Sequence, residues 1–324
     1  MLKIGTIELG EQSLLLAPME NVTDPSFRII CRRMGAAMVF TEFISSDGLL
    51  RKTDKSMAKL LFSEEERPIG IQIYGHMPAS MIHAAIMAEE ARPDIIDLNF
   101  GCPKKKISNR GAGAGMMREV DKMVSITREI VRHVSLPVTV KTRLGWDENS
   151  KNITEVTEKL QDAGISAITV HGRTRNQFYQ GTADWTLIGE LKNNPRIRIP
   201  VIGNGDIDSP VKAKEMFTKY GVDGIMIGRA AMHAPWIFND IHLYLINEMT
   251  GNPYPLRNKI QLALDQLDLS IRYKGIPRGI YEMRHFLVSY FSNLPGFKEI
   301  KSGLVNTVDE NEMHNLIRSL IYYS

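Results

Sequence analysis

The chain has 324 residues, of which 43% are hydrophobic and 24% are charged, and this balance excludes a disordered or fibrous protein. A formal net charge of +3 tolerates a polyanionic partner without requiring one. The length exceeds that of a usual single domain, so we expect one large domain and a smaller one.

The two cysteines, Cys31 and Cys102, form no CxxC pair and no disulfide framework, which is typical of a reducing compartment. The N-terminal segment lacks the basic and apolar regions of a signal peptide, and no stretch approaches the roughly 20 apolar residues that cross a bilayer. We therefore expect a cytoplasmic protein that is not attached to a membrane. The eight histidines form neither an HExxH motif nor a cluster with cysteines, so we expect no metal site.

Short apolar runs recur through the first 230 residues, and a segment with helical periodicity follows each of them. The runs are LLLA at 14–17, MVFT at 38–41, IGIQI at 69–73, IIDLN at 95–99, VTVK at 138–141, AITVH at 167–171, PVIGN at 200–204 and GIMIG at 224–228. Strands that are apolar on both faces and alternate with helices predict a parallel sheet covered by helices. Eight such units favour a (β/α)8 TIM barrel, with a doubly wound open sheet as the alternative.

Each predicted strand ends beside a residue that could bind a ligand or take part in catalysis. In chain order these residues are Pro18 and Met19, Glu42, Gln72, Asn99 with Cys102, Lys141 with Arg143, His171 with Arg173, Asn204 with Asp206, and Gly228 with Arg229. Barrel active sites form at the C-terminal ends of the strands, so we expect these residues at one site. Taken singly, a strand-end amide usually caps a loop, and a strand-end histidine is more often structural than catalytic.

Two glycine-containing strand exits, GNGDI at 203–207 and GRAAM at 228–232, favour a phosphate-bearing ligand. Glycines let backbone N–H groups approach a ligand, and the loops after strands seven and eight are a common phosphate site in such barrels. Tight turns alone would also explain either motif. The segment GAGAG at 111–115 follows no strand and lacks the GxGxxG spacing, so we interpret it as a pliable loop.

Residues 240–324 contain no convincing strand but keep two helical faces. Ile260, Leu264, Leu267 and Ile271 form one face, and Met313, Leu316, Ile317 and Leu320 form the other. The segment DENE at 309–312 predicts an N-cap with its capping partner. Prolines and a glycine in TGNPYPLRN mark the boundary, so we predict a barrel at 1–240 and a small all-helical domain at 250–324.

The stretch DLNFGCPKKK at 97–106 places Cys102 at a strand end beside a basic loop. A thiol with an ordinary pKa of about 8.5 is mostly protonated at neutral pH and can act as a general acid. A nucleophilic thiol needs an adjacent base or a lowered pKa; the sequence shows no such base, although Lys141 and Arg143 can lower the pKa. Cys31 lies on the apolar side of a predicted helix, where we expect a small buried side chain.

The motif series as a whole resembles that of the tRNA-dihydrouridine synthases, and it is nearest their bacterial B-type branch. The motifs are APM at 17–19, TEFISSDGL at 41–49, GIQIYG at 70–75, DLNFGCPKKK, VKTRLGW at 140–146, VHGRTR at 170–175, GNGD and IGRAA. They run in order from about residue 12 to 238, and the resemblance extends more loosely through the helical tail.

The resemblance implies an FMN-binding barrel followed by a helical tRNA-recognition domain. It implies flavin contacts from Pro18, Met19, Glu20, Gln72, Lys141, His171, Asn204, Gly205, Asp206, Gly228 and Arg229. It also implies that Asn99 places the target uracil, that Lys104, Lys105, Arg143 and Arg173 face RNA, and that Cys102 is the catalytic proton donor. The tail adds Arg272, Tyr273, Lys274, Arg278, Tyr281, Arg284 and His285 as candidate RNA contacts.

The implied reaction is the reduction of specific uridines in tRNA to 5,6-dihydrouridine. Hydride passes from reduced FMN to C6, Cys102 protonates C5, and NADPH reduces the flavin again; we expect no obligate protein partner. A base inside folded RNA must first leave its stack, and the barrel mouth supplies the pocket. Three alternatives stay open: an FMN barrel acting on a free pyrimidine, such as a dihydroorotate dehydrogenase; a Schiff-base aldolase using Lys141; and a non-catalytic RNA-binding module.

Overall fold

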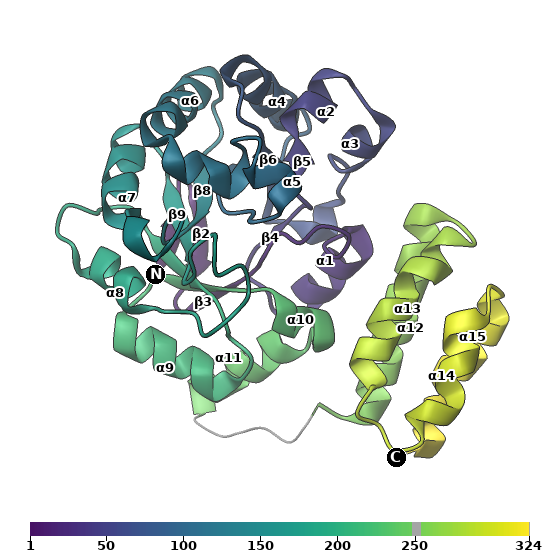
Figure 1. Cartoon of the computed structure of the whole chain (residues 1–324). Helices are drawn as coiled ribbons and strands as arrows, with labels where there is room; N and C mark the ends of the chain where they lie inside the picture. Colours follow the sequence, from purple (N-terminus) through teal and green to yellow (C-terminus); the bar gives the residue numbers. More distant parts are fainter. Residues whose placement is uncertain (248–253, 324) are drawn as a thin grey trace.

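A computed structural model describes residues 1–247 and 254–323, and its larger part is a parallel barrel (Figure 1). The barrel strands are β3 (Ser13–Leu16), β4 (Val39–Phe40), β6 (Ile69–Tyr74), β7 (Ile95–Asn99), β8 (Val138–Arg143), β9 (Ala167–His171), β10 (Val201–Asn204) and β11 (Gly224–Ile227). Neighbours in sequence are neighbours in the sheet, and β5 (Ile44–Ser45) also pairs with β6. The first strand pairs with the last, and a bridge between Leu15 and Met38 joins β3 to β4.

The predicted (β/α)8 barrel is therefore confirmed, and all eight apolar runs are strands. The doubly wound alternative is wrong because its sheet is open, whereas here β3 pairs with β11. Strand β8 continues two residues beyond its predicted end. Side chains alternate along a strand, so Lys141 and Arg143 lie on the same face of β8.

A hairpin that the sequence did not indicate precedes the barrel. Its strands are β1 (Leu2–Ile4) and β2 (Ile7–Gly10), which pair antiparallel. Leu2 and Ile4 are fully buried in one cluster with inward residues of the barrel such as Ile202 and Met226. The hairpin was missed because its strands are short and interrupted by charged residues, so they resemble an exposed terminus.

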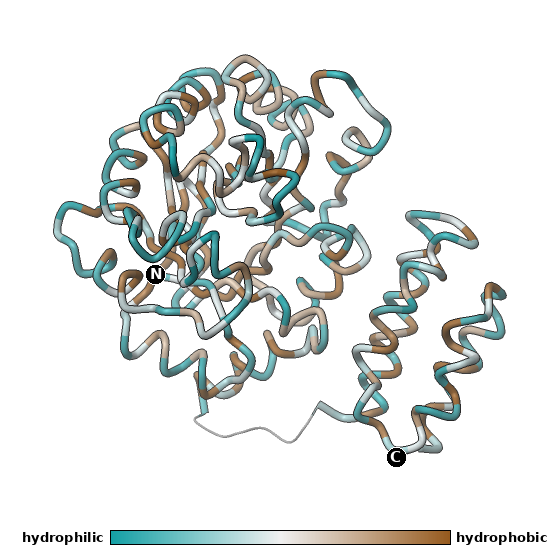
Figure 2. The backbone as a smooth tube through the Cα atoms, viewed as in Figure 1, coloured by the Kyte–Doolittle hydropathy of each residue, from teal (hydrophilic) through white to brown (hydrophobic). Residues whose placement is uncertain are grey.

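Helices surround the barrel and pack its outer face, and apolar residues concentrate toward the strands (Figure 2). They are α1 (Pro25–Arg33), α2 (Ser46–Leu50), α3 (Asp54–Ala58), α4 (Pro78–Glu90), α5 (Lys105–Ser108), α6 (Val120–His133), α7 (Ile153–Asp162), α8 (Thr186–Asn193), α9 (Pro210–Tyr220), α10 (Arg229–His233) and α11 (Ile237–Asn247). Short 3-10 helices are η1 (Glu64–Glu66), η2 (Gly113–Arg118) and η3 (Glu148–Ser150). None of the helices in the described ranges is long and apolar enough to cross a membrane.

The tail is helical, as predicted, in the described residues from 254 onward. Its elements are α12 (Leu256–Lys274), α13 (Arg278–Phe291), α14 (Phe297–Asn306), α15 (Glu310–Ser319) and η4 (Leu320–Tyr323). Part of the predicted boundary, residues 250–253, lies outside the described residues. Asp309 caps α15 by accepting from the Glu312 N–H at 2.8 Å, but the Glu312 carboxylate accepts from the Thr307 hydroxyl, so the reciprocal half of the predicted cap is wrong.

The tail packs on helix α1 of the barrel (Figure 1). The rings of Phe27 and Phe286 stack with centroids 4.9 Å apart. Lys274 pairs with Asp24, the N-cap of α1, and also with Glu282. Cys31 is fully buried in the large hydrophobic cluster, as predicted for a small apolar side chain, and burial raises the pKa of its thiol.

Candidate active site

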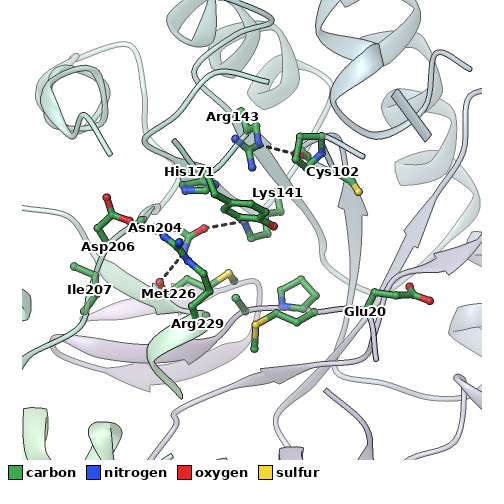
Figure 3. Close-up of a pocket in the computed structure, with 18 of the residues that line it drawn as sticks. Glu20, Cys102, Lys141, Arg143, His171, Asn204, Asp206, Ile207, Met226 and Arg229 are labelled. Carbon is green, nitrogen blue, oxygen red and sulfur yellow. Dashed lines mark hydrogen bonds and ion pairs between the residues drawn. The ribbon is translucent and has the colours of Figure 1, made fainter. Parts of the chain in front are cut away.

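A cavity of 640 Å³ opens at the C-terminal ends of the barrel strands (Figure 3). Most of the residues predicted at strand exits line it, namely Pro18, Met19, Glu20, Asn99, Cys102, Lys104, Lys141, Arg143, His171, Asn204, Gly205, Asp206, Gly228 and Arg229. Figure 3 shows Cys102 and Glu20 on one side of the cavity and Asp206 and Arg229 toward the other. Side chains from many different loops therefore converge on one space, as the barrel prediction required.

Three predicted site residues lie elsewhere. Gln72 is fully buried and lies behind Asn99, whose Nδ2 donates to Gln72 Oε1 at 2.8 Å. Arg173 is also buried, and it donates to both carboxylate oxygens of Asp206, at 2.8 and 2.7 Å, instead of facing RNA. Lys105 lines a neighbouring cavity. Gln72 and Arg173 point inward because hydrogen-bond partners satisfy their polar groups there.

Asn99 shapes the backbone around Cys102. Its Oδ1 accepts from the N–H groups of Gly101 and Cys102, at 3.0 and 2.9 Å, and so turns the chain at the end of β7. The cysteine is 8% exposed and lines the cavity. Burial raises the pKa of the Cys102 thiol, because lost hydration outweighs the backbone N–H of Lys104 and the charges of Lys104 and Arg143. Arg143 lowers the pKa, as the sequence suggested it could, but burial has the larger effect, so the thiol is protonated at neutral pH.

Asp97, which the sequence reasoning missed, fixes the amides behind Cys102. Its carboxylate accepts from Gln72 Nε2 and Thr139 Oγ1, each at 2.5 Å. Because an ionised carboxylate only accepts, Gln72 must present Nε2 to Asp97 and Oε1 to Asn99, which leaves Asn99 Oδ1 for the Cys102 loop. Burial raises the pKa of Asp97 to about 6, against the hydrogen bonds from Thr139 and Gln72. An acidic residue inside the apolar run IIDLN was the available signal.

The glycine-rich segment 111–115 supports the same loop. Gly113 has φ +54°, and a Cβ added there would lie 2.9 Å from the carbonyl oxygen of Cys102. The Ala114 N–H donates to that carbonyl oxygen at 3.1 Å. The expectation of a pliable loop is wrong: the segment enters helix η2, and a glycine is needed because the Cys102 backbone is so close.

Lys141 and His171 lie in the floor of the cavity. Lys141 Nζ donates to Asn204 Oδ1 at 2.9 Å, and Asn204 Nδ2 donates to the Met226 carbonyl at 2.8 Å. Burial lowers the pKa of Lys141 to about 8, with Arg143 adding to the effect and Asp97 opposing it. Burial also lowers the pKa of His171 well below its ordinary value, and the positive charges of Arg143 and Lys141 add to this effect. At pH 7 the lysine is therefore charged and the histidine neutral.

Asp206 organises the opposite end of the cavity, after β10. Besides Arg173, its carboxylate accepts from Arg229 Nη2 at 2.8 Å and from the Ala183 N–H at 2.7 Å. Burial opposes ionisation of Asp206, but the Arg173 and Ala183 hydrogen bonds and the two arginine charges lower its pKa. Arg229 keeps 52% of its side chain exposed. The carboxylate therefore positions an accessible cation beside the glycine exits.

Three other charged residues at or near the mouth, Glu20, Glu42 and Arg143, are bonded to neighbouring groups. Glu20 lies 3.0 Å from Lys59 Nζ, which also reaches Glu42 at 3.3 Å. Arg143, predicted to face RNA, is 2% exposed, and it donates to the carbonyl groups of Gly101, Thr174 and Phe178 at 2.8 to 2.9 Å. It therefore holds together the loops after β7 and β9, although its edge still lines the cavity.

Tyr179 was not predicted, yet it forms one wall of the cavity. The guanidinium groups of Arg143 and Arg229 lie 5.7 and 5.1 Å from its ring centroid. Two aromatic residues in the polar segment NQFYQG at 176–181 were the available signal.

A family model described as dihydrouridine synthase (Dus) matches residues 15–321. A protein of Pseudomonas aeruginosa named tRNA-dihydrouridine synthase B is 39% identical over 302 residues, which are 93% of this chain and 90% of that protein. A protein of the same name from Xanthomonas campestris is 38% identical over 311 residues, covering 96% and 92%. A probable tRNA-dihydrouridine synthase of Rickettsia typhi is 39% identical over 308 residues, covering 94% and 92%.

Solved structures that are similar to this chain share its fold at low sequence identity. A mutant of morphinone reductase in complex with tetrahydroNAD has a TM-score of 0.56 and 10% identity, covering 75% of this chain and 89% of that chain. A complex of 2-naphthoyl-CoA reductase with 2-naphthoyl-CoA has a TM-score of 0.55 and 12% identity, covering 75% and 51%.

Proposed function

The chain belongs to the dihydrouridine synthase family, and from this premise we propose that it reduces specific uridines of tRNA to 5,6-dihydrouridine, using FMN and NADPH. The resemblance that the motifs indicated is confirmed over residues 15–321, beyond the range where the motifs are dense. The observation that supports the proposed chemistry best is the placement of Cys102, a thiol whose pKa burial raises, at the edge of a cavity whose far end offers glycines and an accessible arginine.

The cavity fits a flavin mononucleotide. Its 640 Å³ lies within the roughly 300 to 1,000 Å³ of typical cofactor sites, and Pro18 and Met19 supply an apolar wall. Gly205 has φ +129°, and an added Cβ would lie 2.6 Å from the Cβ of Ala183, so a side chain there would disturb the wall. Arg229 would hold the phosphate, while Lys141 and Asn204 would meet the polar edge of the ring. Gln72 would act through Asn99.

Cys102 would donate the proton in the reduction. A reduced flavin, when bound, would supply the hydride that C6 of the uracil accepts. The Cys102 thiol then gives its proton to C5, and a raised pKa suits this role because the proton is present at the start. The thiolate left behind accepts the Lys104 backbone N–H and is reprotonated from solvent. Asn99, held by Gln72 and Asp97, keeps the sulfur in place.

The proposed substrate is tRNA, in the cytoplasm. The target base would leave its stack to enter the cavity beside Lys104. In the tail, the proposed recognition domain, several predicted contacts are already engaged: Lys274 and Arg278 pair with Glu282, and Arg284 donates to backbone carbonyls. Arg272 and Tyr273 are exposed and are better candidates for RNA contact.

Mass spectrometry of dihydrouridine, position by position, tests the proposal in tRNA from cells lacking this protein. We expect specific positions to lose the modification and wild-type protein to restore it. Cys102→Ala should fail to restore it, whereas the matched control Cys31→Ala should succeed. Unchanged tRNA would contradict the proposal, and turnover of a free pyrimidine would then favour the dehydrogenase alternative. Neither the aldolase nor a non-catalytic module explains family membership over 15–321.

A further inference from the structure

A second cavity, of 540 Å³, adjoins the first at the barrel mouth. Its lining comes from the beginning of α5 and from the loop between β9 and α8: Pro103, Lys105, Arg175, Asn176, Phe178, Tyr179 and Gln180. Pro103 and Tyr179 also line the first cavity, and Pro103 directly follows Cys102. Any ligand in the second cavity is therefore a near neighbour of one at Cys102.

Phe178 is exposed in this cavity although its backbone is unfavourable. The residue is 41% exposed, and its φ is +56°, a region that bulky residues rarely adopt. Arg143 Nη1 donates to its carbonyl at 2.9 Å, and its N–H donates to the Arg175 carbonyl at 3.1 Å. Its ring packs edge-on against Tyr179, with centroids 4.8 Å apart. The loop thus holds an aromatic ring at the surface instead of in the core, and such strain is typical of binding sites.

The charges around the ring complement a nucleic acid. Arg175 stacks on Trp146 at 4.4 Å and donates to Ser108 Oγ at 2.8 Å, so its positive charge is fixed in the wall. Lys105 adds a second cation, and within the described residues the lining contains no carboxylate. Asn176 and Gln180 contribute side-chain amides. A ring for stacking, cations for phosphate and amides for base edges together match a nucleotide in single-stranded RNA.

We propose that the second cavity binds the nucleotide next to the target uridine, with its base stacked on Phe178 and its phosphate beside Lys105 and Arg175. This inference rests on the proposed function. When the target uridine leaves the stack, the adjacent base loses a stacking partner. Phe178 replaces that partner, and the shared Tyr179 wall separates the two bases.

Two substitutions separate the ring from the backbone at position 178. Phe178→Asn removes the ring while suiting the left-handed backbone, so the loop should keep its structure. Phe178→Tyr keeps the ring and is the matched control. With in vitro transcribed tRNA, Phe178→Asn should raise the KM about tenfold, the effect typical of a lost base-stacking contact, with kcat at saturation nearly unchanged. Phe178→Tyr should resemble wild type, and both variants should retain wild-type thermal unfolding and KM for NADPH.

Transcripts that lack one base beside the target uridine, on its 5′ or its 3′ side, locate the contact. One of the two abasic transcripts should raise the wild-type KM about tenfold and leave the KM of Phe178→Asn unchanged from its value with intact tRNA. If each abasic transcript raises the KM of Phe178→Asn by the same factor as the KM of wild type, the inference is overturned and the proposed function still stands. A changed KM for NADPH in Phe178→Asn would assign the cavity to the reductant and also overturn it. Absence of dihydrouridine from the wild-type reaction would overturn both proposals.

Discussion

The two ends of the main cavity differ in whether they favour an ionised side chain. Behind Cys102 the polar groups of Asn99, Gln72 and Asp97 are buried and bonded to one another, and burial disfavours ionisation of the thiol. At the other end the Asp206 carboxylate stays ionised and positions the half-exposed Arg229. The difference would suit the two proposed tasks: a proton donor must remain neutral until it reacts, whereas an anion site must exchange water for a charged ligand.

Removing the sulfur should have the largest effect. We expect Cys102→Ala to bind FMN and accept electrons from NADPH at near wild-type rates, while its reduction of tRNA falls by about 10²- to 10⁴-fold, as for a lost general acid. Stopped-flow measurement of the two half-reactions checks this. Cys31→Ala is the control and should keep both rates. A defect already in oxidation of NADPH would mean that the cysteine end serves the flavin, and the contrast between the two ends would fail.

Arg229→Ala should weaken binding of FMN to the flavin-free protein by about ten- to a hundredfold, the loss expected for one charge-assisted hydrogen bond. Fluorescence titration measures the dissociation constant. Riboflavin, which lacks the phosphate, is the matched ligand and should bind wild type and variant alike. Equal losses for both ligands would place Arg229 at the ring, through its contact with Tyr179, instead of at a phosphate.

Asp97 gives the buried network a pH signature. Its pKa is about 6 in the folded protein and about 3.9 in the unfolded chain, so the folded state binds the proton more tightly and stability falls as pH rises from about 4 to 6. Between pH 4.5 and 7 this contribution amounts to about 2 kcal/mol. Urea unfolding at pH 4.5 and at pH 7 measures the free energy of unfolding of wild type and of Asp97→Asn. Relative to wild type, the variant should be about 2 kcal/mol more stable at pH 7 than it is at pH 4.5. A difference that does not change with pH would show that Asp97 is not a buried titrating group.

The smallest effect concerns thiol reactivity. Because burial raises the pKa of Cys102, alkylation of the flavin-free protein by iodoacetamide should be slower at pH 7.5 than that of a free cysteine. The rate should rise with pH to a midpoint above about 8.5, the ordinary value for a thiol. The measurement is made on the Cys31→Ala variant, so that Cys102 is the one thiol that can be alkylated. A midpoint below 8.5 would indicate an activated nucleophile and contradict the proton-donor role.

Strand exits were predictable because each strand is an apolar run with its chemistry placed directly after it. The apolar runs predicted the barrel, and in the barrel Cys102, Lys141 and Arg229 line one cavity. Side-chain direction was less predictable, because it depends on partners distant in sequence. Arg173 turned inward to Asp206, 33 residues away. Gly113 looked like part of a flexible loop, since nothing local shows that the Cys102 carbonyl lies against it.

Arg143 has a consequence for how binding free energy is used. One buried guanidinium bonds carbonyl groups on both loops of the mouth, so these loops are ordered before any substrate arrives. Fixing the backbone of a flexible residue costs about 1–2 kcal/mol of conformational entropy. If the loops became ordered only when RNA binds, this cost would be subtracted from the binding free energy for every residue involved. Under the proposed function, the free energy of binding RNA would instead go toward extruding the uridine, a step that costs a few kcal/mol. Loops that are ordered in advance would thus leave more of the binding free energy for opening the RNA.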